Sequence, residues 1–133
     1  MLLNLISQSV NNCYGETRQR MKIFNYASIE AETVDCCPSN VQVRWLITKD
    51  MGANNFAMRL FVIGPDGNTP LHTHHWEHEI FILGGKGAVF DGTKITSFKK
   101  DDVVFIPLDE RHQLRNTGKK LLKLLCLIPN NKK

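Results

Sequence analysis

Short apolar runs separated by turn residues follow one another from Val41 almost to the end of the chain. This rhythm is typical of strands and turns rather than of helices. The runs cover residues 41–47, 56–63, 79–83, 88–90, 94–98, 103–106, 112–115 and 121–128. Some eight strands in about 90 residues predict an all-β fold whose sheets close or stack, as in a double-stranded β-helix or jelly roll.

Residues 1–20 differ from the rest, because asparagine, serine and glutamine are interspersed among leucines. A new segment begins at Met21. We therefore expect an N-terminal extension over residues 1–20, whose apolar positions dock on the barrel or on a partner subunit. One domain should cover residues 21–133, with its barrel at about 41–129, since 133 residues fit a single domain.

The net charge of +4 is scattered over the chain in isolated pairs such as Lys99-Lys100 and Lys119-Lys120. Without a basic stripe we expect no nucleic-acid partner. No apolar run approaches the roughly 20 residues of a membrane span, so no membrane partner is expected. The cysteines stand at 13, 36, 37 and 126 without a CxxC pair, which favours free thiols and a cytoplasmic location.

The most informative stretch is a tract that holds four of the five histidines, from His72 to His78. On an extended strand, residues 72, 74, 76 and 78 share one face, so His72, His74 and His78 would point together into the barrel. Imidazole is a common ligand of divalent metals. One strand cannot surround an ion, so His112, outside the tract, should supply a further ligand. The pattern predicts a mononuclear metal site.

A helical zinc-protease site is the competing interpretation, because His74 and His78 are four residues apart. That motif needs a glutamate at position 75, where His75 stands, and its flanks read as strands. His75 has the opposite strand parity, and we place it at the mouth or surface.

Two stretches of the chain resemble the two sequence motifs of the cupin family. The first runs through Gly67, Pro70, His72, His74, Glu79 and then Gly85 or Gly87, and the second through Pro107, His112 and Asn116. Asp101 and Asp109 stand where the family usually has glycines, which puts the local turn conformations in question. The resemblance covers about residues 56–129 and implies a cupin barrel with an N-terminal extension.

Within the family, the chain resembles a subgroup of minimal cupins similar to the small manganese cupin of Thermotoga. Segments 55–61, 76–81 and 125–129 carry this likeness. It implies a four-histidine site with His78 as the third ligand, a Mn²⁺ ion, and a homodimer. Fe²⁺ comes next, and ligand softness alone also allows Zn²⁺, Ni²⁺ or Cu²⁺.

The sequence offers two candidates for the third metal ligand, His78 and Glu79. Glu79 matches the general family position, and its carboxylate would partly neutralise the metal. His78 shares the strand parity of His72 and His74, whereas Glu79 would need a bulge to face inward. We therefore favour His78 and keep Glu79 as the alternative.

Strand parity and the resemblance also suggest which residues surround the metal. We expect a pocket lined by Arg59, Trp76, Leu114, Leu124, Cys126 and Ile128, with Arg59 and Glu77 as candidate catalytic residues. Phe56, Phe61, Phe81, Phe90 and Phe105 are expected in the core.

The expected function is a Mn- or Fe-dependent oxygenase, or a peroxide-using oxidase, that acts on a small organic substrate. The alternatives are a metal-dependent isomerase or lyase and a non-catalytic small-molecule-binding or sensor protein.

Overall fold

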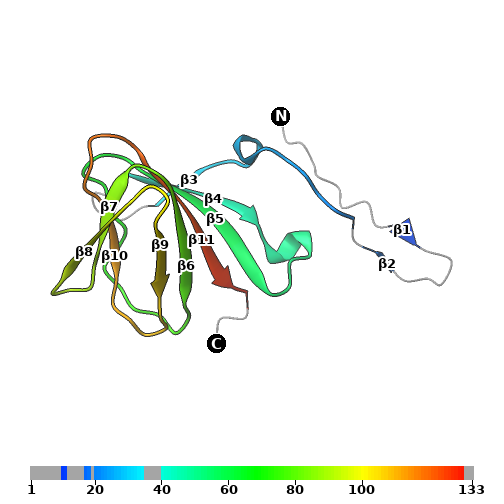
Figure 1. The fold of residues 1–133 in the computed structure, drawn as a ribbon. Coiled ribbons are helices and arrows are strands. Elements are labelled where there is room, and N and C mark those ends of the chain that lie inside the picture. Colours follow the sequence, from blue (N-terminus) through cyan, green and yellow to red (C-terminus); the bar gives the residue numbers. More distant parts are fainter. Residues whose placement is uncertain (1–9, 12–16, 19, 35–39, 131–133) are drawn as a thin grey trace.

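A computed structural model describes residues 10–11, 17–18, 20–34 and 40–130, and Figure 1 shows two antiparallel sheets that face each other. The strands of the barrel are β3 (Glu32–Thr33), β4 (Val41–Ile47), β5 (Phe56–Ile63), β6 (His78–Gly84), β7 (Lys86–Phe90), β8 (Ile95–Lys99), β9 (Val103–Ile106), β10 (Gln113–Asn116) and β11 (Leu122–Pro129). Two 3-10 turns, η1 (Tyr26–Ser28) and η2 (Lys49–Met51), complete this part of the chain. The all-β, jelly-roll fold expected from the sequence is confirmed.

The larger sheet has the strand order β3-β4-β5-β11-β6-β9, and the smaller one has the order β10-β7-β8. The chain between β5 and β6 crosses to the smaller sheet, where isolated bridges pair Asn68 with Arg115 and His72 with His112. The last strand, β11, lies between β5 and β6 in the middle of the larger sheet. Strands from both ends of the domain therefore hold the floor of the barrel together.

The core lies between the sheets and follows the period-two alternation of the strands. On β11 the inward residues Leu122, Leu124, Cys126 and Ile128 are at most 2% exposed. On β6, His78, Ile80 and Ile82 are buried, and the residues between them are not. The inner face of these two strands is therefore apolar except at His78.

Three of the phenylalanines expected in the core lie on the outer face of the larger sheet instead. Phe56, Phe81 and Phe105 are 59%, 42% and 58% exposed. Each occupies a strand position of outward parity, and Phe105 pairs with the exposed Glu79 across β9 and β6. The expectation treated them as core on hydrophobicity alone, whereas strand parity decides which face a side chain joins.

Two aspartates take the backbone conformation for which the family usually places glycine. Asp101 and Asp109 have φ values of 74° and 64°, in the left-handed region. Aspartate tolerates this region better than most residues with a Cβ. The turns are therefore kept despite the substitutions. Gly85, between β6 and β7, has φ 83°, and a Cβ there would lie 2.6 Å from the Leu121 carbonyl oxygen.

The segment before β3 crosses the outer face of the larger sheet. The Tyr26 ring lies 5.5 Å from the charged groups of both Arg44 on β4 and Lys123 on β11. Arg44 Nε donates to the Ile29 carbonyl oxygen at 3.0 Å. This cover explains why Leu60, which has outward parity on β5, is only 3% exposed.

The structure describes part of the expected N-terminal extension. The strands β1 (Val10–Asn11) and β2 (Thr17–Arg18) pair in a two-stranded sheet of their own, drawn apart from the barrel in Figure 1. The leucines expected to dock on the barrel lie outside the described residues, as do Cys13, Cys36 and Cys37. Among the described residues, no helix is long and apolar enough to cross a membrane.

Candidate metal centre

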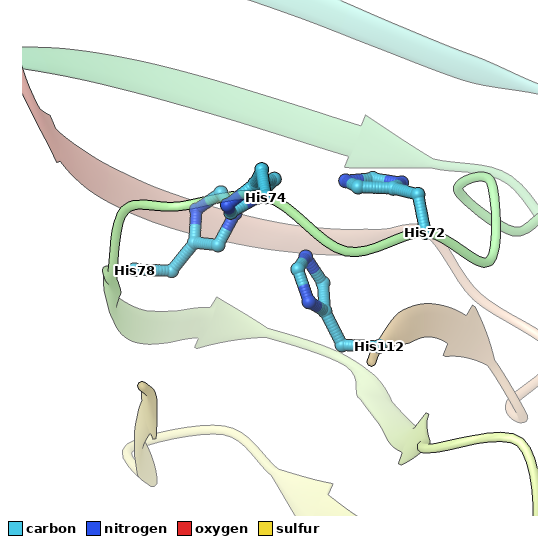
Figure 2. A group of neighbouring side chains, drawn as sticks. All are labelled: His72, His74, His78 and His112. Carbon is cyan, nitrogen blue, oxygen red and sulfur yellow. The ribbon is translucent and has the colours of Figure 1, made fainter. Parts of the chain in front are cut away.

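Four histidines from three places in the chain converge inside the barrel (Figure 2). His72 and His74 lie in the crossing segment, His78 opens β6, and His112 directly precedes β10. The continuous strand expected over residues 72–78 is not formed, because the chain bends at 75–76 and the strand begins at His78. His78 faces inward through the alternation of β6 itself.

The backbone holds the two distant parts of the cluster together. His72 and His112 form an antiparallel bridge in which each N–H donates to the other's carbonyl oxygen, at 3.1 and 3.0 Å. The Asp109 N–H also donates to the His74 carbonyl oxygen at 2.8 Å. The potential ligand atoms of the four histidines all lie within 4.8 Å of one another, so they could hold a divalent metal ion.

Three of the four imidazoles are oriented by a carbonyl oxygen two residues away. The Nδ1 atoms of His72, His74 and His112 lie 2.9, 2.9 and 2.8 Å from the carbonyl oxygens of Pro70, Trp76 and Glu110. A carbonyl oxygen only accepts, so each Nδ1 carries the proton and each Nε2 keeps its lone pair. This is the tautomer that a metal ligand bound through Nε2 requires.

His78 has different neighbours at Nδ1, namely Arg59 Nη2 at 3.2 Å and Cys126 Sγ at 3.0 Å. Arg59 Nη2 also donates to Cys126 Sγ at 3.1 Å. The Arg59 guanidinium carbon lies 5.3 Å from the Trp45 ring and 5.0 Å from the Phe61 ring. These aromatic faces lie beside a side chain whose Nε is buried without a hydrogen-bond partner among the described residues.

Burial favours the neutral form of three of the histidines, His74, His78 and His112. Burial, followed by the charge of Arg59, lowers the pKa of His78 from 6.5 to about 3. Burial is also the main cause that lowers the pKa of His74 and of His112. Neutral imidazoles offer the lone pairs that a metal needs without first releasing a proton. Burial raises the pKa of the Cys126 thiol.

A cavity of about 430 Å³ opens above the cluster. Of the expected pocket residues, Arg59, Trp76, Leu114, Cys126 and Ile128 line it. Leu124 does not line it and packs in the core instead. The sequence interpretation missed further lining residues, which include Val43, Trp45, Thr69, Ile80 and Ile106, and it assigned Phe61 to the core.

Strand parity could have found part of this wall. Val43 and Trp45 alternate on β4, and Trp45 pairs with Arg59 on β5. The ring of Trp76 stacks on that of His74, with centroids 4.0 Å apart and an angle of 2° between the planes. The cavity therefore combines an aromatic wall with a histidine floor.

The carboxylates near the histidine tract lie elsewhere. Glu77 and Glu79 are exposed and line a second, smaller pocket with Phe56. Neither belongs to the cluster of four histidines. His75 pairs with Asp109 at the surface, 3.1 Å apart. Among the described residues that line the main cavity, Glu32 is the acidic one, and it is exposed.

Comparison with known proteins gives a consistent family. Residues 59–128 match the family model described as the cupin domain. The structure is similar to that of a polyketide cyclase from Streptomyces resistomycificus, with a TM-score of 0.78 and 28% identity over 85% of this chain and 82% of that one. It is also similar to a predicted oxalate decarboxylase from Thermotoga maritima, with a TM-score of 0.69 and 28% identity over 81% and 98% of the two chains.

Among curated proteins, 1-methylthio-D-xylulose 5-phosphate methylsulfurylase of Rhodospirillum rubrum is 32% identical over 53% of this chain and 46% of its own length. The chain spans about half the length of the curated relatives it matches. The expected likeness to a small cupin of Thermotoga is confirmed.

Proposed function

The chain belongs to the cupin family, and from that premise we propose that it is a metal-dependent oxygenase or peroxide-using oxidase of a small organic molecule. The observation that carries the proposal is the convergence of four imidazoles on the floor of an apolar cavity. Four protein ligands on a six-coordinate ion leave two positions for oxygen donors, and a bound redox metal would supply Lewis-acid and one-electron chemistry there.

We propose His72, His74, His78 and His112 as the ligands, with manganese as the ion and iron as the next choice. The donor set fits a mid-row divalent metal, because three of the rings are already held in the required tautomer. We propose His78 rather than Glu79 as the third ligand, since His78 lies in the cluster and Glu79 lines the other pocket. The preference for manganese rests on the resemblance to the small Thermotoga cupin.

The cavity favours a flat, apolar substrate that carries an anionic oxygen. Trp45, Phe61 and Trp76 provide aromatic surface, and a volume of about 430 Å³ suits a small molecule. No carboxylate of the described chain offsets a metal charge at the floor, and Arg59 adds a further positive charge. A phenolate or an enolate would match both the aromatic surface and the positive charge. Within this proposal Arg59 attracts the anion, and the aromatic wall excludes water from it.

Oxygen and peroxide consumption by the manganese and iron forms, measured against small phenols, alkenes and diketones, tests this proposal. We expect turnover with at least one of these classes and its loss in His112→Ala. Val89→Ala, on β7 outside the cavity lining, is the matched control and should retain turnover. Silence across the panel would contradict the oxidative function.

The same assay distinguishes two alternative functions. The likeness to a polyketide cyclase favours a metal-dependent isomerase or lyase, for which product forms without consumption of oxygen. The lack of a carboxylate at the floor of the described cavity favours a sensor that binds its ligand without turnover. A ligand that binds in a calorimetric titration and is recovered chemically unchanged would support the sensor function.

We also propose that the protein forms a homodimer in the cytoplasm. The outer face of the larger sheet exposes Phe81, Val103 and Phe105, and Met21 and Ile23, which precede β3 in the chain, are 89% and 91% exposed. A second copy would cover such apolar surface. The free thiol of Cys126 agrees with a reducing compartment. Sedimentation of the native protein measures the mass, and a monomer at micromolar concentration would contradict the dimer.

A further inference from the structure

His78 differs from the other three histidines in the proton that its ring carries. His74 Nδ1 donates to the Trp76 carbonyl oxygen, so His74 Nε2 has a lone pair and no proton. His74 Nε2 and His78 Nε2 lie 2.7 Å apart, which is a hydrogen-bond distance. A hydrogen bond over this distance would take its proton from His78 Nε2.

The other side of the His78 ring agrees with this assignment. With its proton on Nε2, a neutral His78 has a lone pair on Nδ1. Arg59 Nη2, 3.2 Å from that atom, can only donate, so it fits an accepting Nδ1. The ring is thus hydrogen-bonded at both nitrogens, but in the tautomer that cannot ligate a metal through Nε2.

Metal binding through Nε2 requires the proton of His78 to move to Nδ1. A proton on Nδ1 would face an N–H group of Arg59, and that group cannot accept a hydrogen bond. The Nδ1 N–H of this buried ring therefore needs another acceptor. Cys126 Sγ lies 3.0 Å from His78 Nδ1, and Arg59 Nη2 donates to the same sulfur at 3.1 Å. Because a thiol can both donate and accept, Cys126 fits either tautomer of the ring.

We propose that Cys126, fixed by Arg59, is a positioning residue that accepts the Nδ1 proton of His78 and so allows the fourth imidazole to ligate the metal. The inference rests on the metal site proposed above. Pro70, Trp76 and Glu110 supply carbonyl oxygens to the other three rings, and Cys126 replaces such a carbonyl at His78. His78 becomes the ligand whose readiness depends on a side chain rather than on the backbone.

Zinc binding by three variants tests the role of the sulfur. Cys126→Val fills the space but cannot accept a hydrogen bond, and we expect zinc affinity to fall about 10- to 100-fold. Cys126→Ser keeps a group that donates and accepts, and should stay within about threefold of the wild type. Leu124→Val, on the same inward face of β11 but outside the cavity, is the matched control and should bind zinc as the wild type does.

Nitrogen NMR of protein labelled at histidine reads the tautomers directly. In the metal-free wild type we expect His78 to be protonated at Nε2 and His72, His74 and His112 at Nδ1. With zinc bound, all four rings should be protonated at Nδ1. A Nδ1 proton on His78 before zinc is added would overturn the proposed tautomer exchange.

Different results would contradict the metal site and the role of Cys126. Wild-type protein that binds no zinc or manganese would overturn the metal site, and this inference with it. Wild-type protein that binds zinc tightly, together with a Cys126→Val variant of equal affinity, would overturn the role of Cys126 and leave the metal site intact. Weak binding by Cys126→Ser as well would also reject the role, because the hydroxyl restores the hydrogen bond.

Discussion

The low pKa of His78 predicts that the metal-free protein loses stability in mild acid. Burial keeps the imidazole neutral in the fold, with a pKa of about 3 against 6.5 for an unperturbed histidine. The unfolded chain binds a proton below pH 6.5, and the folded chain does not bind it at this ring until about pH 3. The contribution of His78 to stability is therefore complete above pH 6.5 and is lost as the pH falls toward 3.

The magnitude follows from the two pKa values. Between about pH 7.5 and pH 5, His78 alone should remove about 2 kcal/mol from the free energy of unfolding. His74 and His112 act in the same direction, because their pKa values are also lowered. The fall of the wild type should therefore exceed the share of His78.

Urea denaturation at the two pH values, with a chelator present, measures this fall. Trp45 and Trp76 line the cavity and report unfolding by fluorescence. In His78→Gln we expect the fall to shrink by about 2 kcal/mol relative to the wild type. His75→Gln, which loses only the surface pair with Asp109, should keep the wild-type fall to within about 1 kcal/mol. Equal falls in His78→Gln and the wild type would refute the reasoning.

Three further predictions concern the metal ligands and two turns. His112→Ala should lose bound metal and Glu79→Ala should keep it, as read by metal analysis of untagged protein; the reverse result would make Glu79 the ligand. Asn116→Ala should destabilise the fold by about 2–3 kcal/mol with metal content unchanged, because the Asn116 amide nitrogen donates to the Ile63 and Lys120 carbonyl oxygens at 2.8 Å each. Asp101→Gly should be about 1 kcal/mol more stable to urea than Asp101→Ala, since φ there is 74°; equal stability would show that this turn relaxes.

The sequence was sufficient for the strands and for three histidines of the tract, because both follow from local pattern, whereas His112 was the histidine that remained and also matched the second cupin motif. Apolar runs and turn residues placed the eight predicted strands to within one residue, apart from β7, which begins two residues earlier than predicted, and they did not indicate β3. Parity brought His72, His74 and His78 to one side although the strand assumed for them bends at 75–76. Parity works at His78 because β6 starts there and alternates regularly.

The rest depended on which elements face each other, and that is not local. Leu124 shares the inward parity of Cys126, yet only Cys126 reaches the cavity, because the distance along the barrel separates core from pocket. Phe81 is as hydrophobic as a core residue but has the outward parity of Glu79. The carbonyl contacts of the imidazoles depend on backbone positions that no residue pattern encodes.

The bridge between His72 and His112 determines how the protein would behave when metal is scarce. Bringing together two points separated by some 40 residues costs a free chain about 3 kcal/mol of closure entropy. In this barrel backbone hydrogen bonds at 3.0 and 3.1 Å join the two points directly, independently of any shared ligand. Small zinc domains unfold when they lose their ion. We expect this barrel instead to keep its fold when the metal is removed, so that it would bind metal again without refolding.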